Sequence, residues 1–268
     1  MIELAPHNPN GLALRTPVIV APGCAAAVPD PDPALIGAIA TQRATLGPPQ
    51  SAAALPPPRW GELPAGLVLA RLPTLRLRTL LQSEARRWAR LPLPVLVSLC
   101  GTADELVAMV AQLDEVEGPA AVIVEVDAPP AEQAAAVAAL RARTLLPVLV
   151  RCDVPEQAAA LVHAGADALI VAGYPRGCGL AGEELVEGVL LGPATIGRTL
   201  LLLRHTRAQV AVPLVALGGI ADARLARACL QAGANAVMID AAFYGMPDAP
   251  RRIALELSRS KASAADSA

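Results

Sequence analysis

Three charged residues carry the side chains best suited to acid–base chemistry. Glu125 and Asp127 lie two positions apart at the end of the apolar run 121–126, and Arg151 ends a second apolar run, 148–151. Alternate side chains of a strand share a face, so the two carboxylates would point the same way. A carboxylate beside a guanidinium can act as a general base next to a substrate anchor. Alternatively, Glu125 and Arg151 form a structural ion pair across neighbouring strands, and we expect this pair.

A pair of glycines forms a second candidate site. The apolar run 212–217 ends in Gly218 and Gly219, and a helical pattern follows within a few residues. Glycines between a strand and a helix let backbone N–H groups face an anion, and a helix N-terminus is partially positive. In phosphate-binding (β/α)8 barrels, the loops after strands seven and eight form that site. A turn that merely requires glycine explains the pattern equally well.

Apolar runs separated by helical patterns repeat along the chain and must position these residues. Their alternation favours a closed parallel barrel over an open sheet. The predicted strands are residues 18–21, 36–40, 95–98, 121–126, 148–151, 168–171, 214–217 and 236–239. The helical patterns are residues 103–112, 131–143, 155–163, 196–207 and 223–231. The expected fold class is therefore α/β, a (β/α)8 TIM barrel, with a short N-terminal β-hairpin over residues 2–14.

Two long insertions interrupt this repeat. Residues 41–67, rich in Pro and Ala, follow the second strand, and residues 173–193, rich in Gly, follow the sixth. Both would lie over the C-terminal mouth of the barrel, where active sites of this architecture are found. Trp60 and Tyr174 fall in these loops, and we expect them to pack within the resulting lid, with the lining of a pocket as the alternative.

Length and composition limit the classes of function. The 268 residues suit a single barrel domain, residues 1–259, and the Ser- and Ala-rich tail, residues 260–268, is expected to be disordered. A formal net charge of −2, without a basic patch, argues against a nucleic-acid partner. No apolar run reaches about 18 residues and no secretory signal is recognisable, so we expect a cytoplasmic protein without a membrane span.

The cysteines do not indicate a metal centre. Their number is odd and they show no CxxC spacing. Cys24, Cys100, Cys152 and Cys178 follow predicted strands and would lie near one end of the barrel. We expect them to be small buried residues, with a soft-metal site or a displaced thiol base as the alternative.

Several segments, taken in order, resemble the class 1 dihydroorotate dehydrogenases. Residues 10–23, NGLALRTPVIVAPG, are similar to that family's opening hairpin and first strand. Residues 36–41, followed by the sequence PPPR at 56–59, are similar to its second strand and Pro-x-Pro-Arg loop. Residues 191–194, LGPA, resemble its Ser-Gly-Pro-Ala segment, and residues 216–220, ALGGI, resemble its flavin-phosphate turn. The likeness spans nearly the whole chain.

The resemblance implies an FMN-binding barrel that oxidises dihydroorotate to orotate in pyrimidine biosynthesis. In that reaction a base removes a proton from the substrate while hydride passes to the flavin. The cofactor-binding positions that it implies are Ala21, Gly23, Arg151, Gly192, Gly218, Gly219, Asp240 and Ala241. It further implies a small-molecule substrate and an oligomer, formed either by identical chains or with another subunit.

The chain differs from the family at the positions of the family's catalytic and cofactor-binding residues. The family's catalytic Cys after the fourth strand corresponds to Ala128, and its two lysines correspond to Gln42, with Arg43 adjacent, and to Arg151. In the second phosphate loop, Asp240 takes the place of a Gly. A carboxylate about 4 Å from a phosphate would weaken binding by up to roughly a thousandfold at an effective dielectric constant near 20.

Two functions from different classes remain open. The first is a divergent FMN oxidoreductase, with Arg151 near the flavin and Glu125 or Asp127 as candidate bases. The second is a non-catalytic barrel that acts as a partner or regulatory subunit, with the Glu125–Arg151 pair in the space of the flavin. The replaced residues favour the second, since a fold alone does not fix a function.

Overall fold

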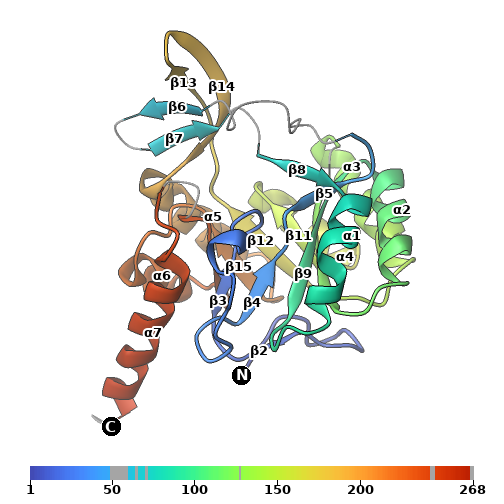
Figure 1. Ribbon diagram of the computed structural model, residues 1–268, viewed down its shortest axis with the longest axis horizontal. Coiled ribbons are helices and arrows are strands. Elements are labelled where there is room, and N and C mark those ends of the chain that lie inside the picture. Colours follow the sequence, from blue (N-terminus) through green and yellow to red (C-terminus); the bar gives the residue numbers. More distant parts are fainter. Residues whose placement is uncertain (49–59, 64–65, 70–71, 127, 242–244, 266–268) are drawn as a thin grey trace.

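A closed ring of eight parallel strands forms the centre of the molecule (Figure 1). The computed structural model describes residues 1–48, 60–63, 66–69, 72–126, 128–241 and 245–265. In ring order the strands are β3 (Val18–Val20), β4 (Ala38–Ala40), β9 (Val95–Gly101), β10 (Pro119–Val126), β11 (Val148–Cys152), β12 (Ala168–Ala172), β15 (Leu214–Leu217) and β16 (Ala236–Ile239), which pairs with β3. The predicted (β/α)8 barrel is confirmed.

Continuous apolar runs made these strands predictable. In a parallel barrel both faces of each strand are buried, so the sequence does not alternate. All residues of β12, ALIVA, and of β15, LVAL, are buried. Two strands are shorter than predicted: β3 ends one residue earlier, at Val20, and β4 begins two residues later, at Ala38.

Helices surround the ring. They are α1 (Leu77–Trp88), α2 (Ala103–Leu113), α3 (Pro130–Arg141), α4 (Ala158–His163), α5 (Ile196–Arg207), α6 (Ala223–Gln231) and α7 (Ala249–Ala265), with short 3-10 turns η1 (Ala25–Ala27), η2 (Pro155–Gln157) and η3 (Pro193–Thr195). The five predicted helical patterns are present, while α1 and α7 lie outside them. α7 continues beyond residue 260, where the sequence predicted a disordered tail to begin. Among the described residues, none of these helices combines the length and apolarity needed to cross a membrane.

Local capping fixes where two of the helices begin. α2 starts at a capping box, in which the Thr102 hydroxyl accepts from the Glu105 N–H while the Glu105 carboxylate accepts from the Thr102 N–H. α6 starts at Asp222, whose carboxylate accepts from the Leu225 N–H at 2.7 Å. Both helices therefore begin just past the C-terminal ends of their strands, at the mouth of the barrel.

Two helix-to-strand junctions repeat the same arrangement. Gly165 and Gly233 have φ angles of +106° and +109°, which disfavour any residue with a side chain. A Cβ atom on Gly165 would lie 2.7 Å from Cγ of Arg141, and one on Gly233 would lie 2.8 Å from Cγ of Arg207. The same close approach of an arginine stem thus requires glycine in both units, as the internal repeat predicts.

The predicted hairpin lies across the N-terminal end of the barrel. β1 (Ile2–Glu3) and β2 (Ala13–Leu14) pair in antiparallel fashion. Asp167 anchors the hairpin, because its carboxylate accepts from the Asn8 amide at 3.1 Å, from Arg141 at 3.2 Å and from the Val148 N–H at 2.7 Å.

A small antiparallel sheet, the projecting sheet, stands over the opposite end (Figure 1). It consists of β6 (Trp60–Leu63), β7 (Gly66–Leu69), β13 (Arg176–Ala181) and β14 (Glu184–Leu191), whose pairings close on themselves in the order β13-β14-β7-β6. Both long insertions therefore lie over the mouth, as predicted. Two further strands, β5 (Arg43–Thr45) and β8 (Thr74–Arg76), extend the main sheet outward from β9.

Candidate functional site at the barrel mouth

The strand register brings charged residues together at the C-terminal ends of β9, β10 and β11. Glu125 on β10 lies opposite Cys100 on β9. Val124 lies opposite Val150 of β11, so Glu125 and Arg151 occupy the next level of the ladder on a common face. β5 begins nearby at Arg43, because Ala44 pairs with Leu99 of β9. The fold therefore collects two guanidinium groups around one carboxylate.

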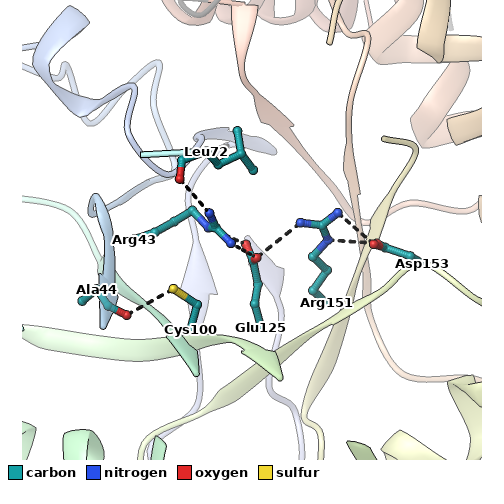
Figure 2. A network of polar contacts seen from close by, with 7 residues as sticks. All are labelled: Arg43, Ala44, Leu72, Cys100, Glu125, Arg151 and Asp153. Atoms are coloured by element: carbon teal, nitrogen blue, oxygen red, sulfur yellow. Dashed lines mark hydrogen bonds and ion pairs between the residues drawn. The ribbon is translucent and has the colours of Figure 1, made fainter. Parts of the chain in front are cut away.

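These side chains form a continuous network across the mouth (Figure 2). Arg43 donates from Nε to Oε1 of Glu125 at 3.1 Å, and its Nη2 pairs with Oε2. Nη1 of Arg151 lies 3.3 Å from the same Oε2. Arg151 also holds Asp153 in a bidentate contact, with distances of 2.9 Å from Nε and 2.8 Å from Nη2. The predicted pairing of Glu125 with Arg151 is confirmed, and Arg43 and Asp153 extend it.

Charge and burial shift the pKa values of Glu125 and Arg151 in opposite directions. Burial raises the pKa of Glu125, but the charges of Arg151 and Arg43 outweigh it and lower this pKa overall. Burial lowers the pKa of Arg151, but the charges of Glu125 and Asp153 raise it overall. Glu125 is therefore held ionised between two cations, which makes it a weak base. A general base works best with a pKa near the operating pH, so this arrangement suits a structural role.

Tyr174 connects this network to the far side of the mouth. The guanidinium carbon of Arg151 lies 5.4 Å from the centroid of its ring, within cation–π distance. Its hydroxyl donates to Oδ2 of Asp240 at 2.7 Å. Asp240 is completely buried, and a buried carboxylate requires hydrogen-bond donors. The expectation that Tyr174 packs within the lid is thus wrong, because its hydrogen bond to Asp240 places the ring in the mouth. The side chain of Trp60 lies outside the described residues.

The Gly218–Gly219 turn is tightly packed. The φ angles are +108° at Gly218 and +77° at Gly219. A Cβ atom on Gly219 would lie 2.5 Å from the Ile196 nitrogen, and one on Gly218 would lie 3.1 Å from the Tyr174 ring. The N-terminus of the following helix, α6, is already capped by Asp222. Contacts within the chain thus account for both glycines.

The other predicted cofactor positions also lie at the ends of strands. Ala21 follows β3 and is buried, and Gly23 has a φ angle of +84°. The Gly192 carbonyl accepts from the Thr195 N–H at 3.1 Å and from its hydroxyl at 2.9 Å. Ala241 is buried beside Asp240. The remaining predicted catalytic residue, Asp127, lies outside the described residues.

Two cavities flank Glu125 at the rim. One of about 340 Å³ lies on the Arg43 side and includes Cys100 in its lining. The other, of about 280 Å³, lies on the Arg151 side and includes Gln133. Ligand sites commonly occupy about 300–1,000 Å³, so each cavity suits only a small polar molecule.

Two features of the described mouth conflict with the flavin position that the family likeness implies. The Arg43–Glu125–Arg151 network runs between the two cavities, where an uncharged planar ring system would separate the Glu125 carboxylate from both of its arginines. At the other end, the buried Asp240 carboxylate occupies the implied phosphate loop. Both conflicts arise from side chains that are fixed by contacts within the chain.

The cysteines occupy different environments. Cys24 and Cys152 are buried, as expected, and burial raises the pKa of Cys152 to about 11. Cys100 is partly buried, and its thiol donates to the Ala44 carbonyl at 3.4 Å. Cys178 is exposed on β13 of the projecting sheet, so the expectation that it is buried is wrong. Within the described ranges, no three His, Cys, Asp or Glu side chains are grouped to hold a metal.

Comparisons with known proteins agree with the fold. Residues 95–264 match the model of a family described as nitronate monooxygenase. The chain is 34% identical to the "Dihydroorotate dehydrogenase B (NAD(+)), catalytic subunit" of Desulforudis audaxviator, over 93% of this chain and 90% of that protein. The protein of the same name from Pelobacter propionicus is 30% identical over 94% of this chain and 91% of its own length. A nitronate monooxygenase of Pseudomonas aeruginosa is 42% identical over 49% of this chain and 35% of its own length.

The two relatives named dihydroorotate dehydrogenase align over 93% and 94% of this chain. The nitronate monooxygenase match covers the barrel from β9 onward and marks a related group of barrel oxidoreductases. This chain therefore belongs to the class 1 dihydroorotate dehydrogenase family.

Proposed function

We propose that this barrel is a non-catalytic member of its family and acts as a partner or regulatory subunit. The observation that carries the proposal is the Arg43–Glu125–Arg151–Asp153 network, which fills the mouth with mutually neutralised charges. Two guanidiniums and two carboxylates balance one another, so the network needs no charged ligand to complete it. Each side chain is already held by contacts within the chain.

At three described positions near the mouth, no base for proton abstraction is evident. The position that corresponds to the family's catalytic cysteine is Ala128. Glu125 is held ionised by two arginines, and its pKa is lowered. The thiol at the mouth, Cys100, donates to a backbone carbonyl. Ala128 has no ionisable side chain, Glu125 is engaged by two arginines, and the Cys100 thiol is engaged by a backbone carbonyl, so none of these three positions presents a free base.

The relatives' names suggest where such a subunit would act. Two of them are called catalytic subunits of dihydroorotate dehydrogenase B, a name that presupposes a further subunit. A barrel that keeps their fold without their chemistry could take the place of one chain in a similar assembly, in the cytoplasm and in pyrimidine biosynthesis.

A flavin oxidoreductase is the second candidate. The 34% identity to a dehydrogenase subunit favours it, and so do two arginines near the positions where the family has lysines. In this candidate FMN is the cofactor and dihydroorotate, or a related compound, is the substrate. The guanidiniums would then have to leave Glu125 to contact the flavin.

Titration of the purified chain with FMN discriminates between the candidates. We expect no quenching of flavin fluorescence at tens of micromolar, with the Desulforudis audaxviator relative prepared in parallel as the positive control. Stoichiometric binding with a shifted visible spectrum, followed by bleaching on addition of dihydroorotate, would establish the oxidoreductase instead.

A further inference from the structure

We infer that Tyr174 and Asp240 act together to exclude a phosphate group from the Gly218–Gly219 turn. The inference deepens the proposed function, since it assigns the loss of the family's cofactor to two particular side chains. The residues lie on separate elements, Tyr174 just after β12 and Asp240 just after β16, and their hydrogen bond of 2.7 Å spans the turn that follows β15.

The ring of Tyr174 is the steric part of this arrangement. It lies against Gly218, where an added Cβ atom would come within 3.1 Å of Cε1 and 3.3 Å of Cδ1. Asp240 holds the ring at its hydroxyl, and the Arg151 guanidinium lies 5.4 Å from its centroid. A group approaching Gly218 from the mouth therefore meets an aromatic ring that is held from two sides.

The backbone preceding the ring is equally constrained. A Cβ atom on Gly173 would lie 2.1 Å from Oγ1 of Thr199, and the Gly173 N–H donates to the Leu217 carbonyl at 3.0 Å. The Thr199 hydroxyl in turn donates to the Gly218 carbonyl at 2.9 Å. The backbone from which the Tyr174 side chain starts is thus held in place, and the ring itself is held by its contacts with Asp240 and Arg151.

Asp240 is the electrostatic part. Its side chain is fully buried, so solvent does not screen the carboxylate. Removing a carboxylate about 4 Å from a bound phosphate would raise affinity by up to about a thousandfold at an effective dielectric constant near 20. Each part is sufficient by itself to oppose phosphate binding. Removal of the ring alone still leaves a carboxylate, and removal of the charge alone still leaves the ring.

A test follows from this redundancy of the ring and the carboxylate. We would measure the binding of inorganic phosphate by calorimetry to the wild type, to Tyr174→Ala, to Asp240→Asn and to the double variant. We expect binding in the double variant only, at least about tenfold tighter than in either single variant, because the two changes are coupled. Tyr174→Ala combined with Asp153→Asn is the matched control, since it removes the same ring and a different carboxylate of the mouth.

A cooperative thermal transition must accompany each measurement, and Tyr174→Thr replaces Tyr174→Ala if the latter does not fold. A folded double variant that binds no phosphate overturns the inference, and so does equal binding by the wild type or by the Asp153 control. Comparison of FMN with riboflavin on the wild type separates this inference from the proposed function. Equal binding of both flavins, with bleaching on addition of dihydroorotate, would overturn only the proposed function, whereas much tighter binding of FMN than of riboflavin would overturn the inference.

Discussion

Nη1 of Arg151 lies 3.3 Å from Oε2 of Glu125, and both side chains are about five-sixths buried, at 16% exposure each. An exposed pair on α1, Arg87 and Glu84, has the same 3.3 Å separation at 40% and 36% exposure. The pair on α1 is more exposed and joins one arginine to one carboxylate, so it provides a simpler ion pair with which the mouth network can be compared.

Replacement of Glu125 by Gln should destabilise the protein by about 3 kcal/mol, because Arg43 and Arg151 would remain partly buried without their shared carboxylate. The matched change Glu84→Gln should reduce the free energy of unfolding by less than about 0.5 kcal/mol. Urea denaturation of both variants measures the two values. Equal losses would show that the network adds nothing beyond an ordinary surface pair.

The same pair predicts a pH dependence. The pKa of Glu125 is lowered in the folded state from an ordinary value of 4.5, so its contribution is fully present above that value. The contribution is lost as the pH falls from there through the folded-state pKa. We therefore expect the stability difference between wild type and Glu125→Gln to be constant near neutrality and to shrink in acid. A difference that grew on acidification would contradict the assignment.

The rate at which each thiol is alkylated should be lower the more deeply its cysteine is buried. Burial raises the pKa of Cys152 to about 11 and that of Cys229 to about 12, which leaves little reactive thiolate at neutral pH. Cys178 is exposed. With iodoacetamide and mass spectrometry we expect Cys178 to react first, and Cys152 and Cys229 to react only when the protein unfolds. Cys178→Ser should remove the fast phase. Rapid alkylation of Cys229 in the native protein would contradict the burial of this residue on α6.

Glycine substitutions should separate close packing from helix propensity. Gly173→Ala would place a Cβ atom 2.1 Å from Oγ1 of Thr199, and we expect a loss of about 3 kcal/mol or more in unfolding free energy. Gly197→Ala, on α5 with open space around the new atom, should instead stabilise the protein by about 0.5–1 kcal/mol. Thermal unfolding of the two variants measures both effects. A tolerated Gly173→Ala would mean that the junction beneath Tyr174 yields easily.

The barrel could be predicted from the sequence because its order depends on local patterns. Each parallel strand is a continuous apolar run, and glycines such as Gly165 and Gly233 mark repeated junctions. The projecting sheet could not be predicted in the same way. Each of its strands contains a glycine, and β14 pairs with β7 across a distance in sequence that no local pattern spans.

The site was predictable only in part. Two-residue alternation and matching strand depth sufficed to pair Glu125 with Arg151. Arg43 was passed over because the family likeness pointed to Gln42, one position earlier, and nothing local indicates that β5 begins at Arg43. The partner of Tyr174 lies 66 residues away, so their contact depends on the closure of the barrel.

The closed pairing of the projecting sheet couples the evolution of two insertions that lie far apart in the sequence. β6 and β7 come from the first insertion, and β13 and β14 come from the second, so each hairpin supplies hydrogen-bond partners for the other. A deletion in one would expose unpaired N–H and C=O groups on the other, as on any uncovered strand edge. The lengths of the two insertions should therefore change in concert among homologues, and a homologue that has lost one hairpin should have lost both.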